Sequence, residues 1–193
     1  MNKKYHEVVI VAAARTPIGA YKGSLKNVKA DQLGSIVIKE VLKRSKINSD
    51  EINEVILGQV LTSATGQNPA RQASINAGLP NFIPAHLVNQ VCGSGLRSVI
   101  SGFQTIKLNE AKYIISGGQE NMSITPHALL YRNDNKLLEE RLIDTMIYDG
   151  LIDAFNNYHM GVTAENIAEK FKISRDDQDN FAFRSQKKTQ LAV

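Results

Sequence analysis

Cysteine and long apolar runs are what this sequence has least of, and each shortage excludes a class of protein. A single cysteine among 193 residues rules out an internal disulfide and fits a reducing, cytoplasmic setting. No apolar stretch approaches the roughly 20 residues that a membrane-spanning helix needs, and the start of the chain does not read as a signal peptide. Spacings of Cys and His typical of metal sites are absent too. We therefore expect a soluble protein without a metal centre.

The composition is otherwise that of a globular protein. Hydrophobic residues make up 42% of the chain and charged residues 22%, which is enough for one sizeable core. The formal net charge is +4, with 23 Lys and Arg spread among 19 Asp and Glu, so no basic patch for nucleic acid stands out. A mildly basic surface suits an anionic ligand.

Hydrophobic periodicity predicts alternating strands and helices. An unbroken apolar run at 7–14 indicates a strand buried on both faces, and further strands are expected at 54–60, 84–91 and 113–116. Between them, helical spacing predicts a helix with Asp31 as N-cap, a helix at 69–77 and a helix opened by Gly93-Ser94-Gly95. In the last of these, one face is expected to point inward: Leu96, Val99, Ile100, Phe103 and Ile106. The fold class is α/β, a mostly parallel sheet with helices packed on it.

The second part of the chain departs from this pattern. A polar, loop-like stretch runs from Asn121 to Asn135, and helices resume with Thr163 and Ser174 as expected N-caps. Ser174 and Asp177 resemble a capping box, with Phe181 as the buried anchor of the last helix. The chain stops at Val193 within a helical pattern, from which we expect that part of the fold is missing.

Cys92 lies where a strand is expected to end and a helix to begin. The free amides and dipole of a helix N-terminus stabilise a thiolate, and the neighbouring glycines let the backbone approach a ligand closely. A cysteine at a strand end is equally often a small core residue, so its position alone leaves both readings open.

Several motifs together resemble the thiolase family and cover most of the chain. The acyl-enzyme signature is matched by Val88-Asn89-x-x-Cys92-Gly93-Ser94-Gly95-Leu96-x-Ser98-Val99. Further matches occur in the same order, at Ala14-Arg15-Thr16-Pro17-x-Gly19, Gly117-Gly118-x-Glu120-Asn121-Met122, Gly150-Leu151-x-Asp153-Ala154 and Tyr158-His159-Met160-Gly161. The last motif looks more like the short-chain biosynthetic branch of the family than the long-chain degradative one.

The resemblance implies an acyltransferase that carries an acyl group on Cys92. Such an enzyme condenses two acetyl-CoA to acetoacetyl-CoA, or performs the reverse thiolysis, with a coenzyme A thioester as substrate and no covalently bound cofactor. The resemblance also implies that Leu151, His159 and Met160 line the acyl and pantetheine end of the pocket. Asn89 and Glu120 are expected to be a buried hydrogen-bonding scaffold beside the site, with Gly117 and Gly118 allowing close packing.

The resemblance further implies how the chain is divided. Residues 1–121 correspond to the amino-terminal α/β domain without its last strand, and 122–193 to the start of the inserted cofactor-binding loop domain. The carboxy-terminal domain, which in the family supplies a catalytic His, a second Cys and an Asn, is absent. We therefore expect a sheet left short, and no efficient condensation by these residues without a complementary carboxy-terminal chain.

Partners and alternatives follow from the same comparison. Family members are at least dimers, and His127 lies in a region resembling their tetramer-forming loop, although 131–140 departs from that pattern. His6 and His86 are most simply structural or exposed. Two other functions stay open, a non-catalytic or split-enzyme subunit and a ketoacyl synthase-like condensing enzyme, and the Gly117-Gly118 and His159-Met160 motifs favour thiolase over the latter.

Overall fold

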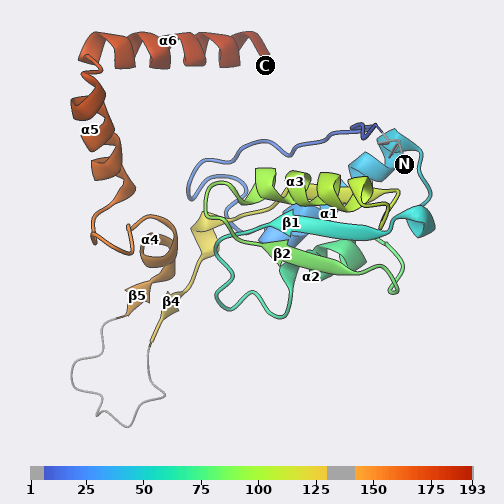
Figure 1. The fold of residues 1–193 in the computed structure, drawn as a ribbon. Helices are drawn as coiled ribbons and strands as arrows, with labels where there is room; N and C mark the ends of the chain where they lie inside the picture. Colours follow the sequence, from blue (N-terminus) through green and yellow to red (C-terminus); the bar gives the residue numbers. More distant parts are fainter. Residues whose placement is uncertain (1–6, 130–141, 193) are drawn as a thin grey trace. The chain divides into compact units, whose positions relative to one another are not determined.

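A three-stranded parallel sheet organises the first part of the chain. The computed structural model describes residues 7–129 and 142–192. Strands β1 (Glu54–Gly58), β2 (Ala85–Val88) and β3 (Ile114–Gly118) lie in the order β2-β1-β3, with all pairs parallel (Figure 1). Parallel neighbours require crossover connections, and a helix supplies each one. The predicted α/β class is confirmed, as are the three strands expected between 54 and 116.

Helices α1 (Ala30–Ser45) and α2 (Pro69–Asn76) cover one face of this sheet. Their contact with alternate residues of β1 forms the core, because successive side chains of a strand point to opposite faces. The completely buried side chains here come from both helices and the strand: Ile38, Ala70, Ala73, Val55 and Leu57. Ile52, Leu79 and Ile83 complete this cluster.

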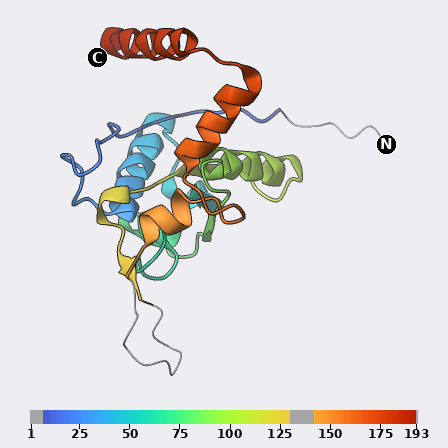
Figure 2. The same ribbon diagram turned by 90° about the vertical axis from the view of Figure 1, so that its left-hand side faces the viewer.

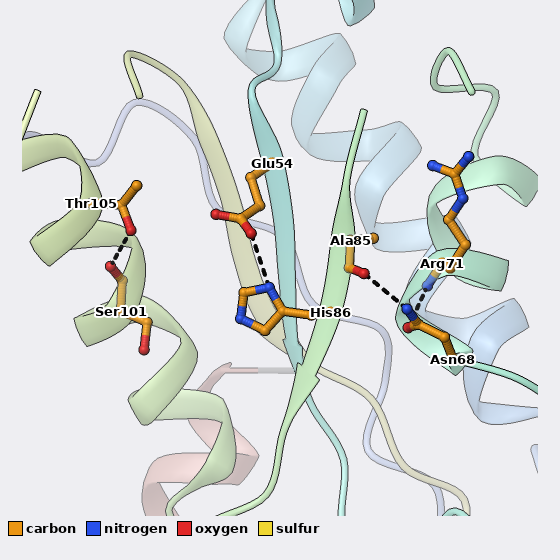
Figure 3. A network of polar contacts seen from close by, with 7 residues as sticks. All are labelled: Glu54, Asn68, Arg71, Ala85, His86, Ser101 and Thr105. Atoms are coloured by element: carbon orange, nitrogen blue, oxygen red, sulfur yellow. Dashed lines mark hydrogen bonds and ion pairs between the residues drawn. The ribbon is translucent and has the colours of Figure 1, made fainter. Parts of the chain in front are cut away.

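Asn68 fixes the start of α2 against the sheet. Its side-chain oxygen accepts a hydrogen bond from Arg71 N at 3.1 Å, while its amide nitrogen donates to Ala85 O at 2.8 Å, at the start of β2 (Figure 3). The helix expected at 69–77 is confirmed. For α1 the expected N-cap is wrong, because Lys29 takes that position and Asp31 lies in the first turn, 8% exposed.

Helix α3 (Ser94–Lys107) lies on the other face of the sheet, and it is turned differently from the prediction. Its buried residues are the small ones at a four-residue spacing, Ser94, Ser98 and Gly102. The face expected to point inward is exposed, with Leu96 at 68%, Val99 at 37%, Ile100 at 39% and Phe103 at 47%. Small residues on both surfaces let the helix backbone approach the sheet closely: a Cβ on Gly102 would lie 2.6 Å from Ser116 Oγ.

The strand expected at 7–14 is wrong. Residues 7–14 form no regular structure, and the ribbon draws them as a plain coil (Figure 2). Val9, Ile10 and Val11 are 64%, 81% and 61% exposed. A strand needs a neighbour to satisfy its backbone N–H and C=O groups, and among the described residues none pairs with this segment. The guanidinium of Arg44 donates a hydrogen bond to Ala13 O at 2.7 Å.

Short elements follow the sheet. The 3-10 turn η1 (Ser49–Glu51) precedes β1, and η2 (Met122–Ile124) follows β3. Strands β4 (His127–Ala128) and β5 (Ile143–Asp144) pair antiparallel, and α4 (Thr145–Gly150) comes next. His6 and the stretch 131–140 lie outside the described residues. The predicted departure from the tetramer-forming pattern falls on that stretch.

Residues from Leu151 onward form a second compact unit. It contains α5 (Met160–Phe171) and α6 (Arg175–Ala192). The capping box before α6 is confirmed: Asp177 N donates to Ser174 Oγ at 3.1 Å and Ser174 N to Asp177 Oδ2 at 3.3 Å. Two other expectations are wrong, because Thr163 lies inside α5 and Phe181 is 70% exposed. Among the described helices, none is long and apolar enough to cross a membrane.

Candidate active site

The single cysteine lies in the turn that joins β2 to α3. Strand β2 ends at Val88 and α3 begins at Ser94, so Cys92 stands at the carboxyl edge of the parallel sheet. Open α/β sheets bind their ligands at this edge. Cys92 is exposed and unpaired with any other cysteine, which excludes the alternative of a small core residue. The predicted strand-to-helix position is confirmed.

The backbone of this turn is strained at Val91. This residue has φ 47°, in the left-handed region that β-branched side chains avoid. Two neighbours hold it there. Val91 N donates to Asn89 Oδ1 at 2.9 Å, and Val91 O accepts from Ser94 N at 3.1 Å. Both the N–H and the C=O group of Val91, the residue immediately before the cysteine, are therefore held by hydrogen bonds.

Ser94 connects the two halves of the turn. Its hydroxyl donates to Val91 O at 2.6 Å and accepts a hydrogen bond from Gln90 N at 2.8 Å. Gly93 N donates to Gln90 O at 3.0 Å and closes the same loop. Ser94 is 4% exposed, so these bonds are shielded from competition with water.

Glycines seat the turn against the sheet. A Cβ on Gly58 would collide with the backbone of Ser94 and Gly95, and a Cβ on Gly118 would lie 3.4 Å from Gly95 Cα. The ends of β1 and β3 can therefore approach the first turn of α3. The expectation that glycine permits close packing beside Cys92 holds at Gly118, whereas a Cβ added to Gly117 would make only an ordinary contact, 3.8 Å from Leu57 Cδ2.

Glu120 follows β3 and ties it to the segment after β1. Its Oε2 accepts hydrogen bonds from Val60 N at 2.8 Å and Leu61 N at 3.3 Å. Burial raises the pKa of this carboxyl above its ordinary value, and the two backbone N–H groups partly oppose that shift. Its other oxygen, Oε1, is buried and has no hydrogen-bond partner among the described residues. The scaffold role expected for Glu120 agrees with these contacts.

A cavity of about 210 Å³ adjoins this carboxyl. Its lining combines charged and amide side chains with apolar ones, including Lys29, Asp31, Gln59, Leu61, Glu120 and Asn121. Nothing in the sequence pattern indicated it, since its walls come from segments as far apart as 29 and 126.

For Asn89 the expected burial is wrong, whereas for His86 the expected exposure is confirmed. Asn89 is exposed, so its expected place in a buried scaffold is wrong; it acts locally by accepting from Val91 N. The histidine of β2, His86, is exposed as expected, and its Nδ1 lies 2.9 Å from Glu54 Oε1 on β1 (Figure 3). His127 in β4 lies with its Nε2 3.9 Å from Asp144 Oδ2 on the paired strand β5.

The other predicted site residues come together in the second unit. His159 is the N-cap of α5, and its Nδ1 accepts from Gly161 N at 3.0 Å. Met160 N donates to Leu151 O at 2.8 Å, so Leu151, His159 and Met160 form one backbone-linked group. Met160 is 36% exposed and His159 is exposed. Cys92 belongs to the first unit and this group to the second.

Within the described ranges, no group of three or more His, Cys, Asp or Glu side chains could hold a metal ion. Sequence reasoning missed the left-handed Val91 and the double role of Ser94. The signal available was weak: a serine two residues after the cysteine, at the start of a helix, where hydroxyl side chains commonly bond to the preceding turn.

Comparison with known proteins identifies a family and several similar proteins. A family described as "Thiolase, N-terminal domain" matches residues 8–193. The acetyl-CoA acetyltransferase of Paracoccus denitrificans is 53% identical over 186 residues, which are 96% of this chain and 48% of that protein. The acetyl-CoA acetyltransferase of Cupriavidus necator is 50% identical over 187 residues, covering 96% and 48%.

A mammalian relative is similar over the same region. The rat protein named cytosolic acetyl-CoA acetyltransferase is 47% identical over 192 residues, which are 100% of this chain and 48% of the relative. The chain therefore spans about half the length of the curated relatives it matches.

Proposed function

Because this chain belongs to the thiolase family, we propose that it carries out the acyl-transfer half of an acetyl-CoA C-acetyltransferase, with Cys92 as the acyl carrier. The observation that carries the proposal is the exposed Cys92 in its fixed turn, within a chain 53% identical to an acetyl-CoA acetyltransferase. The family match also favours a thiolase over a ketoacyl synthase-like enzyme.

The first step exchanges one thioester for another. The Cys92 thiolate attacks the carbonyl carbon of acetyl-CoA, a bond from that carbon to Cys92 Sγ forms, and the bond to the coenzyme A sulfur breaks. Coenzyme A leaves as a thiolate and takes up a proton. Because reactant and product are both thioesters, the acetyl group stays activated and the step is reversible.

The second step needs groups beyond the described turn. A second acetyl-CoA loses a proton from its methyl carbon, and the carbanion attacks the acetyl-Cys92 carbonyl to give acetoacetyl-CoA and the free thiol. That step needs a base and donors to the thioester oxygen. In the thiolase resemblance these are a His, a second Cys and an Asn of the carboxy-terminal half, which a complementary chain or a longer polypeptide would supply.

Substrate binding is assigned to the second unit. Leu151, His159 and Met160, which share the backbone contacts before α5, are proposed to contact the acyl and pantetheine end of a coenzyme A thioester. No covalently bound cofactor and no metal take part. We also propose that the protein forms a homo-oligomer and is located in the cytoplasm.

Intact-protein mass spectrometry after incubation with acetyl-CoA tests the first step. We expect an acetyl adduct on the wild-type chain that is absent from Cys92→Ala, because removing the sulfur removes the nucleophile. Circular dichroism of both proteins controls for folding.

Each outcome decides between the proposed functions. A Cys92-dependent adduct supports an acyl-transfer half that lacks only the second step. A folded wild-type chain without an adduct contradicts acyl transfer by these residues and leaves the non-catalytic subunit as the better description.

A further inference from the structure

We propose that Ser94 is a positioning residue for Cys92: its hydroxyl holds Val91 in the left-handed conformation that orients the cysteine at the helix start. The inference rests on the proposed role of Cys92 as acyl carrier. It adds a residue whose contribution would act through the turn and not through contact with the substrate.

The first argument is the conformational cost at Val91. A β-branched residue with φ 47° is a genuine outlier, and such strain persists only where surrounding structure over-determines it. Burial does not offset the cost, because the Val91 side chain is 49% exposed. The hydrogen bonds of the turn therefore hold Val91 in this conformation.

The second argument is the number of these bonds that pass through one hydroxyl. Ser94 Oγ donates to Val91 O at 2.6 Å and accepts from Gln90 N at 2.8 Å, so it binds the peptide groups on both sides of the Gln90–Val91 step. Asn89 contributes one further bond, to Val91 N. Removing the hydroxyl therefore releases two of the constraints and leaves the Gln90 N–H without its acceptor.

The third argument is that the sheet fixes Ser94 itself. Its Cβ would lie 2.7 Å from a Cβ placed on Gly58, so β1 comes against the serine with no side chain between them. Cys92, two residues earlier, is exposed. The rigid sheet thus determines the position of the reactive residue through Ser94 and Val91.

Ser98 offers a matched control on the same helix face. It is 0% exposed, compared with 4% for Ser94, and its hydroxyl lies 2.7 Å from the carbonyl oxygens of both Gly95 and Gly117, donating to one at a time. Both acceptors lie outside residues 89–93. Ser98→Ala removes a buried serine hydroxyl without touching the turn.

The experiment compares Ser94→Ala, Ser98→Ala and the double variant Val91→Gly with Ser94→Ala, each as the full chain. The readouts are the rate of Cys92 alkylation by iodoacetamide across a pH series, acetylation by acetyl-CoA, and the thermal unfolding midpoint. For Ser94→Ala we expect alkylation at neutral pH to slow about threefold, since Cys92 leaves the field of the helix N-terminus. Acetylation should fall about tenfold, because misplacing a reacting group is costly.

The double variant separates positioning from general destabilisation. Glycine adopts φ 47° without strain, so Val91→Gly should restore the alkylation profile of Ser94→Ala to within about twofold of wild type. Ser98→Ala should lower the unfolding midpoint as much as Ser94→Ala does while leaving alkylation unchanged.

Equal alkylation rates in wild type and Ser94→Ala, or equal losses in Ser94→Ala and Ser98→Ala, would overturn the proposal. If Ser94→Ala does not fold, the double variant decides by its alkylation rate, and failure of both to fold would assign Ser94 to folding instead. Alkylation that follows the expected pattern in a chain that acetyl-CoA does not acetylate would refute the proposed function and keep the positioning role.

Discussion

The carboxyl of Glu120 combines two properties that seldom occur together in a structural residue. One oxygen accepts backbone hydrogen bonds from Val60 and Leu61, while the other is buried without a partner among the described residues. Hydrogen bonds from N–H groups favour the charged form, whereas burial favours the neutral form, and burial is the larger effect here. The raised pKa makes this residue a source of pH-dependent stability.

Replacing Glu120 by Gln tests this effect. With the folded pKa above the unfolded one, the native state binds more protons, so its free energy of unfolding falls as pH rises from the ordinary carboxyl pKa through the raised one. Glu120→Gln stays neutral and should lack this part of the pH dependence. Chemical unfolding at intervals from pH 4 to 8 measures it, and identical pH profiles for the two proteins would contradict it.

At the scale of the element, α3 shows how the contact surface of a helix is chosen. The helix could turn either its large apolar side chains or its small ones toward the sheet. The facing positions of the strands, Gly58, Ser116 and Gly118, are themselves small, so a close approach of backbones fills the space. The contact made by Ser94, Ser98 and Gly102 satisfies this geometry and leaves the apolar flank of α3 exposed.

Two glycine substitutions distinguish this close approach from helix propensity. Gly58→Ala places a Cβ 2.5 Å from Gly95 N and should cost about 1–3 kcal/mol, because backbone cannot move aside cheaply. Gly95→Ala meets nothing within 4 Å and should raise stability by roughly 0.5–1 kcal/mol through better helix propensity. Denaturant unfolding of both variants measures the difference. Equal effects would mean that α3 is not held against β1.

At the scale of the whole molecule, the chain spans about half the length of the relatives it matches. It covers 48% of the length of the Paracoccus protein. Large hydrophobic side chains are exposed at 9–11 and along α3, and exposed apolar patches of this kind usually mark an interaction site. Under the proposed function, the complementary carboxy-terminal half covers them.

Adding the purified carboxy-terminal half of the Paracoccus relative tests this expectation. Binding should lower the fluorescence of a hydrophobic dye on the chain and allow acetoacetyl-CoA to form from acetyl-CoA. The control is Ile100→Glu, a change on the exposed flank of α3 (39% exposed) that should alter the chain's own stability by no more than about 0.5 kcal/mol. Unchanged dye fluorescence, or full complementation by Ile100→Glu, would refute it.

The sequence predicted local elements well where periodicity and capping agree. The strand expected at 54–60 is β1, the helix expected at 69–77 is α2, and the Ser174 capping box precedes α6. These features depend on neighbours within a few residues, so the sequence alone contains the needed information. The prediction failed at 7–14, because the same apolar run forms a strand only if another strand pairs with it.

The position of Cys92 between a strand and a helix was determined by the sequence itself, since the apolar run before it and the glycines after it specify both elements. Tertiary structure alone decided that Val91 is left-handed, that Ser94 bonds to both sides of it, and which face of α3 meets the sheet. For α3 the physical reason is that its surface meets strands distant in sequence, and periodicity within one segment does not specify the shape of the surface it will meet. The bonds between Ser94 and residues 90 and 91 are local, but Ser94 itself is seated against Gly58 of β1, a contact that only the folded chain makes.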